Sequence, residues 1–166
     1  MTLSPVNLPP QDDVTWAALC AWDEARGETY EGQAAVVEII KHRMALKYSS
    51  DGTVKDTVLW KFQFSGFWFA MDHGHYEQIE KDAAGAEQEA GVLLAQAQGT
   101  PTFEQCLIIA KQVLAGTYVW PGPEGQKLAA CPTAVLYYNP AVCAAPAWAI
   151  PANSVATIGH HEFFKT

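Results

Sequence analysis

The stretch WDEARGETYEGQAAVVEIIKHR, residues 22–43, lies where one apolar helical pattern ends and another begins. Asp13 is a good N-cap, and apolar residues recur behind it at helical spacing, so a first helix is predicted from Val14 to about Ala25. Gly27 follows the last periodic residue, as a helix-ending glycine does. The fold is therefore predicted to begin with two helices that meet at a short connection.

Further helices are predicted from similar start and stop patterns. Thr29 is the expected cap of the second helix, whose buried stripe contains Val36, Val37, Ile40 and Met44. A clear helix is predicted over TPTFEQCLIIAKQVLAG, residues 100–116, where Thr102 opens a capping-box pattern and Gly116 is the stop. The Ala-, Glu- and Gln-rich residues 76–97 favour a solvated helix. The conformation of the aromatic residues 53–69 stays open between a strand and a short helix with a loop.

The C-terminal part of the chain changes to strand patterns. TAVLYYNP, residues 133–140, is typical of a strand that runs into a turn, and SVATIGHHEFF, residues 154–164, of a second strand broken by Gly159. The predicted fold class is α+β, mainly helical with a small antiparallel sheet near the C-terminus. A single domain over residues 1–166 is expected, with residues 1–12 as an extended arm.

Composition excludes several classes of protein. The 166 residues are 49% hydrophobic with a net charge of -8, which excludes disorder and argues against a nucleic-acid partner. No apolar run is long enough to span a bilayer, so membrane insertion is not expected. The N-terminal MTLSPVNLPPQDD has prolines and acids where a signal peptide needs a basic flank and an apolar core, so synthesis in the cytoplasm without a signal peptide is predicted.

The four cysteines show no CxxC spacing of the kind that structural zinc sites use. Cys20 and Cys106 lie in apolar helical patterns and are interpreted as buried thiols. Cys131 and Cys143 flank a possible hairpin and could form a bridge in an oxidising compartment.

Two glutamates four residues apart, Glu24 and Glu28, are candidate acids. Glu24 is expected in the last turn of the first helix, where exposed carbonyl groups and burial would both raise its pKa. A carboxylic acid that stays protonated near neutral pH can protonate the leaving oxygen of an acetal. The alternative is that both side chains are solvated and are neutralised by Arg26.

Histidines and aromatic residues suggest two further kinds of site. A zinc hydrolase could recruit His73, His75 and His161, although HGH lacks the spacing of HExxH. The many aromatic side chains could instead line a carbohydrate groove, because flat rings pack against sugar rings. Hydrogen bonds in such a groove would come from Gln63, Ser65 and Asn139.

Four motifs in order resemble the SleB-like cell wall hydrolase family, which includes spore-cortex lytic enzymes and phage endolysins. They are DEARGETYEGQAAVVEIIKHR at residues 23–43, QFS at 63–65, VLYYNP at 135–140 and IGHHEFF at 158–164, with Trp148 between the last two. The resemblance covers residues 14 to 164. It implies a lysozyme-like, lytic-transglycosylase-like fold that cleaves the β-1,4 bond between N-acetylmuramic acid and N-acetylglucosamine in peptidoglycan.

The resemblance also implies roles for residues. Glu24 falls on the family's catalytic glutamate, and Asp23 stands where the family usually has glycine, so that a second anion would raise the pKa of Glu24 further. Glu28 is expected to have a supporting role, and no metal or other cofactor is expected. The predicted substrate-binding residues are Gln63, Ser65, Tyr137, Tyr138, Asn139 and His161.

The function expected from this resemblance is that of a monomeric phage endolysin. It would reach the periplasm through a holin-type pore and cleave peptidoglycan there as a lytic transglycosylase with one catalytic glutamate. A muramidase would need a second carboxylate across the bond, so hydrolysis stays open as the product outcome. The sequence also leaves open a zinc-dependent wall amidase or endopeptidase, and a wall-binding module without catalytic activity.

Overall fold

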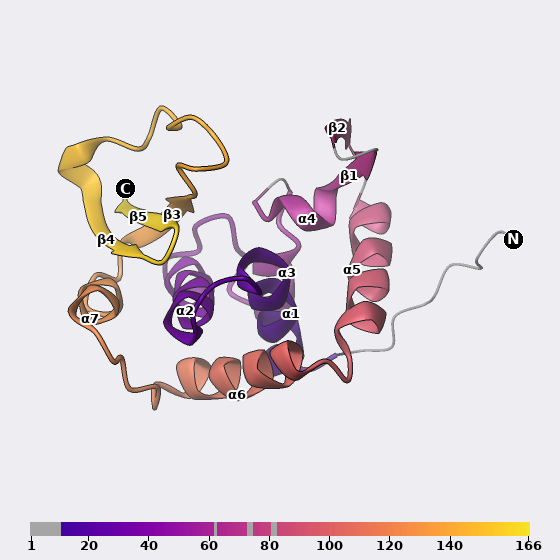
Figure 1. Ribbon diagram of the computed structural model, residues 1–166, viewed down its shortest axis with the longest axis horizontal. Coiled ribbons are helices and arrows are strands. Elements are labelled where there is room, and N and C mark those ends of the chain that lie inside the picture. The colour runs from indigo at the N-terminus through magenta and orange to yellow at the C-terminus, as the bar shows by residue number, and fades with distance from the viewer. Residues whose placement is uncertain (1–10, 62, 73–74, 81–82) are drawn as a thin grey trace, which may run out of the picture.

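The computed structural model describes residues 11–61, 63–72, 75–80 and 83–166. Of the extended arm predicted over residues 1–12, only Gln11 and Asp12 fall in this part. Figure 1 shows helices around α1, with the C-terminal sheet on one side and α5 on the other. The elements are α1 (Asp13–Ala25), α2 (Tyr30–Leu46), α3 (Val54–Val58), α4 (Ser65–Trp68), β1 (Phe69–Asp72), β2 (His75–Glu80), α5 (Ala83–Ala97), α6 (Pro101–Ala115), α7 (Pro123–Ala129), β3 (Ala134–Tyr138), the 3₁₀ turn η1 (Pro151–Asn153), β4 (Ser154–Ile158) and β5 (His161–Lys165).

Helix α1 is the central helix of the fold. It packs against α2, α3, α5 and α6, and every residue from Trp16 to Trp22 is buried. A helix that is apolar on all sides belongs in the core. Its carboxylates are therefore confined to its two ends, with Asp13 in the first turn and Asp23 and Glu24 near the last.

The start of α1 differs from the prediction by one residue. The N-cap is Asp12, whose carboxylate accepts a hydrogen bond from Thr15 N at 2.8 Å, so the assignment of Asp13 as the cap is wrong. The helix ends at Ala25 as predicted, but Gly27 does not adopt the left-handed conformation of a C-cap glycine. The connection instead closes through a hydrogen bond from Glu28 N to Ala25 O at 2.9 Å.

Helices α2 and α6 enclose α1. Thr29 caps α2 as predicted, with its hydroxyl accepting from Gly32 N. The N-cap of α6 is Thr100, which accepts from Phe103 N, so the capping box expected at Thr102 is wrong. Gly116 ends α6 in the left-handed conformation, with φ of 73°, as predicted.

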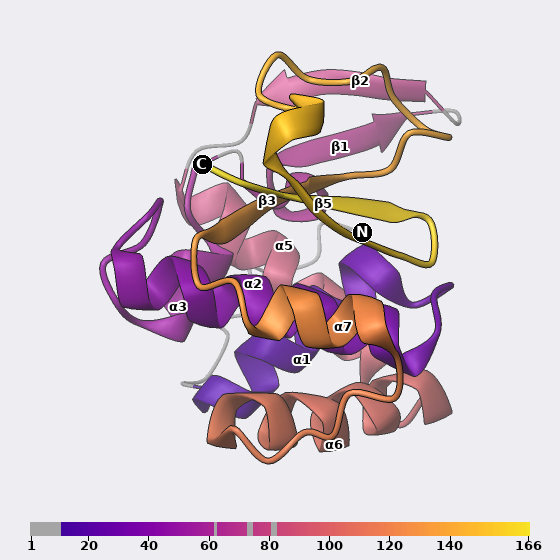
Figure 2. The same cartoon turned by 90° about the vertical axis from the view of Figure 1, so that its left-hand side faces the viewer.

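The antiparallel sheet near the C-terminus has the strand order β3–β5–β4. The strand expected over residues 154–164 is in fact a hairpin, because Gly159 adopts a φ of 59° and reverses the chain between β4 and β5. The sheet lies across α2 and α7, as Figure 2 shows. Ile39 of α2, Leu128 of α7 and Phe163 of β5 share one apolar cluster there. The predicted α+β class is confirmed.

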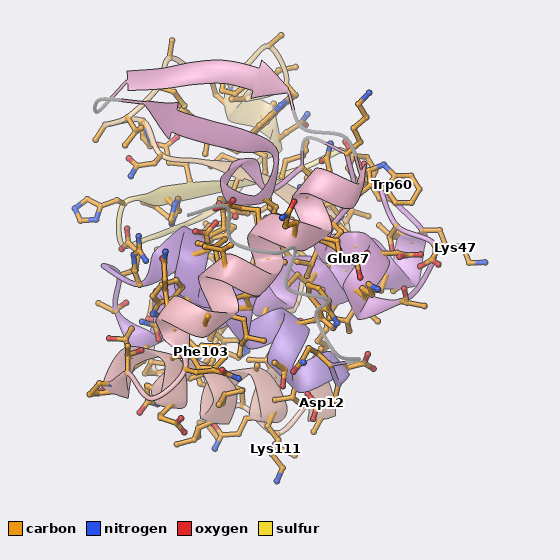
Figure 3. All side chains as sticks on the ribbon, turned by 90° about the vertical axis from the view of Figure 1, so that its right-hand side faces the viewer. Asp12, Lys47, Trp60, Glu87, Phe103 and Lys111 are labelled. Carbon is orange, nitrogen blue, oxygen red and sulfur yellow. The ribbon has the colours of Figure 1, made fainter. Side chains whose placement is uncertain are left out.

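The middle of the chain contains elements that were not predicted. Residues 75–80 form β2 of a hairpin with β1, so the helix expected over 76–97 begins only at Ala83. Helix α5 packs against α4 and α1. Figure 3 views the molecule from this side, with Glu87 labelled on α5. Lys55 of α3 forms an ion pair with it, with 2.9 Å between Lys55 Nζ and Glu87 Oε1.

Candidate active site

A cleft of about 660 Å³ opens at the C-terminal end of α1. Its walls come from the ends of α1 and α2, from α4 and α5, and from β3 and β5 with the loop that follows β3. The structure brings to this one cleft most of the residues that the sequence suggested, namely Asp23, Glu24, Gln63, Tyr137, Tyr138, Asn139 and His161. Residues more than a hundred positions apart thus share a single surface.

Glu24 lies half-buried in the cleft wall. Burial is the main cause that raises its pKa to about 7, and the negative charge of Asp23 raises it further. A hydrogen bond from Tyr137 Oη to Glu24 Oε2, 2.9 Å long, and the positive charge of Arg43 both oppose this rise. The predicted rise in pKa is confirmed, with burial and Asp23 as its causes, and the side chain can hold a proton near neutral pH.

Asp23 occupies the next position on α1 and also lines the cleft. Burial raises its pKa to about 6, Glu89 of α5 adds to the rise, and Arg26 opposes it. The backbone of α4 passes so close that a Cβ at Gly66 would collide with the Asp23 carboxylate. The absence of a side chain at Gly66 therefore leaves the space that the Asp23 carboxylate occupies.

Arg26 is exposed, and its guanidinium lies over the Trp22 ring with 4.4 Å to the ring centroid. The pair is a cation–π contact at the end of α1. No ion pair between Arg26 and either Glu24 or Glu28 is found in the described part of the chain. The alternative in which Arg26 neutralises both glutamates is therefore wrong.

Glu28 does not line the cleft but holds the turn between β4 and β5. Its side chain is 9% exposed, and Oε2 accepts a hydrogen bond from His160 N at 3.3 Å while Oε1 lies 2.9 Å from His160 Nδ1. A Cβ at Gly159 would collide with Oε2, so only glycine lets the turn approach this closely. Glu28 therefore ties the α1–α2 connection to the sheet.

His161 stands between Glu28 and Tyr137. Its Nδ1 lies 3.9 Å from Glu28 Oε1, too far for a hydrogen bond, and its ring packs edge-on against the Tyr137 ring at 5.1 Å between centroids. Burial lowers the pKa of His161. The adjacent His160 is 71% exposed and lies in the turn before β5, so the prediction that both histidines stand in one strand and point to opposite faces is wrong.

Several lining residues were not predicted. Arg43 comes from α2, and α5 contributes Glu89, Leu93 and Gln96. The spacing of these three residues, four and then three apart, places them on one helical face, which the sequence could have indicated. Arg43 ends the motif at residues 23–43. Its position among the apolar residues of the second helix, a charge on a buried stripe, could have indicated it. Ser65 begins α4, and its side chain lies outside the described part.

No group of three His, Cys, Asp or Glu side chains that could hold a metal is found in the described part of the chain. His73 falls outside that part, and of His75 only the backbone is described. All four cysteines are free thiols, so the bridge considered between Cys131 and Cys143 is not formed. In the same part no helix has both the length and the apolar character needed to cross a membrane.

A match to a solved structure now adds to this geometry. The fold is similar to that of a lytic transglycosylase domain. The neighbour is the catalytic domain of the germination-specific lytic transglycosylase SleB from Bacillus anthracis, with a TM-score of 0.57 and 22% sequence identity over 96% of this chain and 98% of that chain. No protein-family model and no curated protein sequence matches the chain. The match confirms the fold that the sequence motifs implied.

Proposed function

We propose that this protein is a peptidoglycan-degrading glycosidase that works as a lytic transglycosylase on the β-1,4 bond between N-acetylmuramic acid and N-acetylglucosamine. One observation carries the proposal. Glu24, the residue on which the resemblance places the catalytic acid, lies in the cleft with its pKa raised to about 7 and a hydrogen bond from Tyr137. The similarity of fold to the SleB catalytic domain supports the substrate class.

Glu24 acts first as an acid in this mechanism. Its protonated carboxyl gives a proton to the glycosidic oxygen, and the bond to C1 of muramic acid breaks as positive charge develops there. The resulting carboxylate keeps the hydrogen bond from Tyr137 Oη. Proton donation is thus followed by a charge on Glu24 that the cleft must stabilise.

Glu24 then acts as a base. Its carboxylate accepts the proton of the C6 hydroxyl while the O6 atom attacks C1, which gives a 1,6-anhydromuramic end and restores the acid. No water is consumed. A hydrolase would instead place water at C1 and leave a reducing end, and it would need a second carboxylate across the bond.

The remaining cleft residues bind the substrate in this proposal. Tyr138 and Asn139 follow Tyr137 along one edge of the cleft, and Gln63 comes from the α3–α4 connection. Aromatic faces pack against sugar rings, and the amides donate and accept hydrogen bonds with N-acetyl groups. His161 completes this wall, and Ser65 stays a predicted binding residue.

The biological setting that we propose is phage lysis, on the ground that the family that the motifs resemble includes endolysins. The protein would act as a monomer in the periplasm after release through a holin-type pore. Expression in a host with and without a holin tests this setting, with lysis expected only when both proteins are present. Lysis without a holin would contradict it.

Mass spectrometry of fragments released from purified sacculi tests the reaction, with Glu24→Gln as the inactive control. Muropeptides with 1,6-anhydro ends are expected. Reducing ends would assign hydrolysis, and released peptides that are lost on chelation would assign a zinc-dependent amidase or endopeptidase. Sacculus binding with no release by the wild-type protein would indicate a wall-binding module.

A further inference from the structure

Arg43 is a buried cation without a charged partner. The residue is 4% exposed, and its Nε donates a hydrogen bond of 2.8 Å to the Val135 carbonyl oxygen. Its guanidinium carbon lies 5.1 Å from the Phe64 ring centroid, while Nη1 has no hydrogen-bond partner. In the part of the chain that the structure describes, no carboxylate lies within ion-pair distance of Arg43.

The neighbouring residue His42 shows that the link to the sheet does not require such a cation. His42 Nδ1 lies 2.8 Å from the Ala134 carbonyl oxygen, so both residues join α2 to β3 in the same way. His42 Nε2, however, lies 3.1 Å from Glu38 Oε1 and thus faces a carboxylate. Both residues therefore join α2 to β3, but among the described residues His42 has a carboxylate beside it and Arg43 does not.

A buried charge without a counterion is costly, so its place in the wall of the cleft that holds Glu24 calls for an explanation. Arg43 lines the same cleft as Glu24, and the positive charge of Arg43 lowers the pKa of Glu24. In the proposed reaction Glu24 becomes negatively charged only after it has given up its proton. The reaction therefore creates a negative charge on Glu24, in the same cleft wall that contains the unpaired positive charge of Arg43.

We propose that Arg43 is a positioning residue that acts through Glu24: across the cleft wall, without a direct ion pair, its charge stabilises the carboxylate formed when the acid transfers its proton. The inference rests on the proposed function. Further titratable groups also set the charge balance around Glu24. They are Cys20 and Asp23 from α1, Arg26 at its C-cap, Glu89 from α5, Tyr137 and Tyr138 from β3, Cys143 from the loop after β3 and His161 from β5.

Arg43→Gln removes the charge and keeps a donor that can reach the Val135 carbonyl oxygen. The charge of Arg43 lowers the pKa of Glu24, so the titration of Glu24 is expected to move up by about 0.5 pH unit when that charge is removed. The alkaline limb of the activity profile should move up with it. The maximal kcat should fall about 3-fold, because the carboxylate formed after transfer is less stable.

The experiment is ¹³C NMR of the side-chain carboxyl carbons across pH, with the Glu24 signal assigned by its loss in Glu24→Gln. Arg43→Lys keeps the charge and should titrate close to the wild-type protein. His42→Gln is the matched control, because it alters the parallel link to β3 and should leave the Glu24 titration in place. If Arg43→Gln does not fold, Arg43→Met replaces it.

A Glu24 titration that stays in place in Arg43→Gln, or that moves equally in His42→Gln, would overturn the inference. So would an equal shift in Arg43→Lys. The titration needs no substrate, so it separates the two proposals. Failure of the wild-type protein to cleave sacculi overturns the proposed function, whereas an unmoved titration in an active enzyme overturns only the role of Arg43.

Discussion

Glu24 and Glu28 lie four residues apart, yet the fold uses them in opposite ways. Glu24 faces the cleft, where burial and Asp23 favour its protonated form. Glu28 faces the β4–β5 turn, where two groups of His160 bind its carboxylate. A glutamate is thus suited to hold a proton where the structure leaves its charge poorly compensated, and forms a structural link where donors surround it.

Glu24→Gln is expected to give the largest effect on activity. General acid catalysis commonly contributes about 10²- to 10⁴-fold, and the amide has no proton to transfer, so release of muropeptides should fall by about that factor. Turbidity of a sacculus suspension measures it. The matched change Glu28→Gln should cost less than about 10-fold, and equal losses in the two variants would remove the distinction between the glutamates.

The free energy of unfolding should separate the same two variants with opposite signs. The pKa of Glu24 is higher in the folded protein than its ordinary value of 4.5, so its ionisation lowers stability as pH rises from about 4.5 to about 7, and the loss levels off at higher pH. Glu24→Gln should therefore gain about 2 kcal/mol at pH 8 and nothing at pH 4. Glu28→Gln should lose about 1 to 2 kcal/mol at pH 7 because it weakens the tie to His160. Urea unfolding at the stated pH values checks both.

Tyr137→Phe tests how the cleft holds the proton of Glu24. The hydrogen bond from Tyr137 lowers the pKa of Glu24, so its loss should raise that pKa and move the alkaline limb of the activity profile up by about 1 pH unit. The wild-type protein should lose activity as pH rises through about 7. A downward shift of the limb in Tyr137→Phe would contradict the assignment of Glu24 as the acid.

Asp23→Asn should move the same limb in the other direction. The negative charge of Asp23 raises the pKa of Glu24, so the amide should lower it and shift the limb down by about 1 pH unit. A double variant of Asp23→Asn and Tyr137→Phe should give a limb close to that of the wild-type protein, and a limb that stays displaced would show that the two contributions do not oppose each other.

The sequence predicted those helices that are marked by neighbouring residues, that is, by apolar spacing and by capping residues at their ends. Helices α1, α2 and α6 follow from apolar spacing and from Thr29 and Gly116 at their ends. Helix α7 has only seven residues and starts without a side-chain cap, so neither signal marked it. The sequence does not distinguish the hairpin at Gly159 from one interrupted strand, because an isolated glycine also marks a bulge.

The site was predictable only as a set of residues, not as an arrangement. The motifs indicated Glu24 and Tyr137, but the hydrogen bond between them joins residues 113 positions apart. Arg43 was missed for a physical reason. In the sequence it is a cation at the end of a helix, where it would suit the helix dipole, and its place on the buried stripe does not indicate that it joins β3.

The tie between Glu28 and the turn at Gly159 and His160 also bears on the order in which the protein is made and folds. Helix α1, which carries Glu24, and helix α2 can pack on α6 before the strands of the C-terminal sheet have been synthesised. Glu28 meets its partner 132 residues later, and contacts of such separation form slowly. During synthesis Glu24 is therefore present long before β3 and β5, which complete the cleft around it.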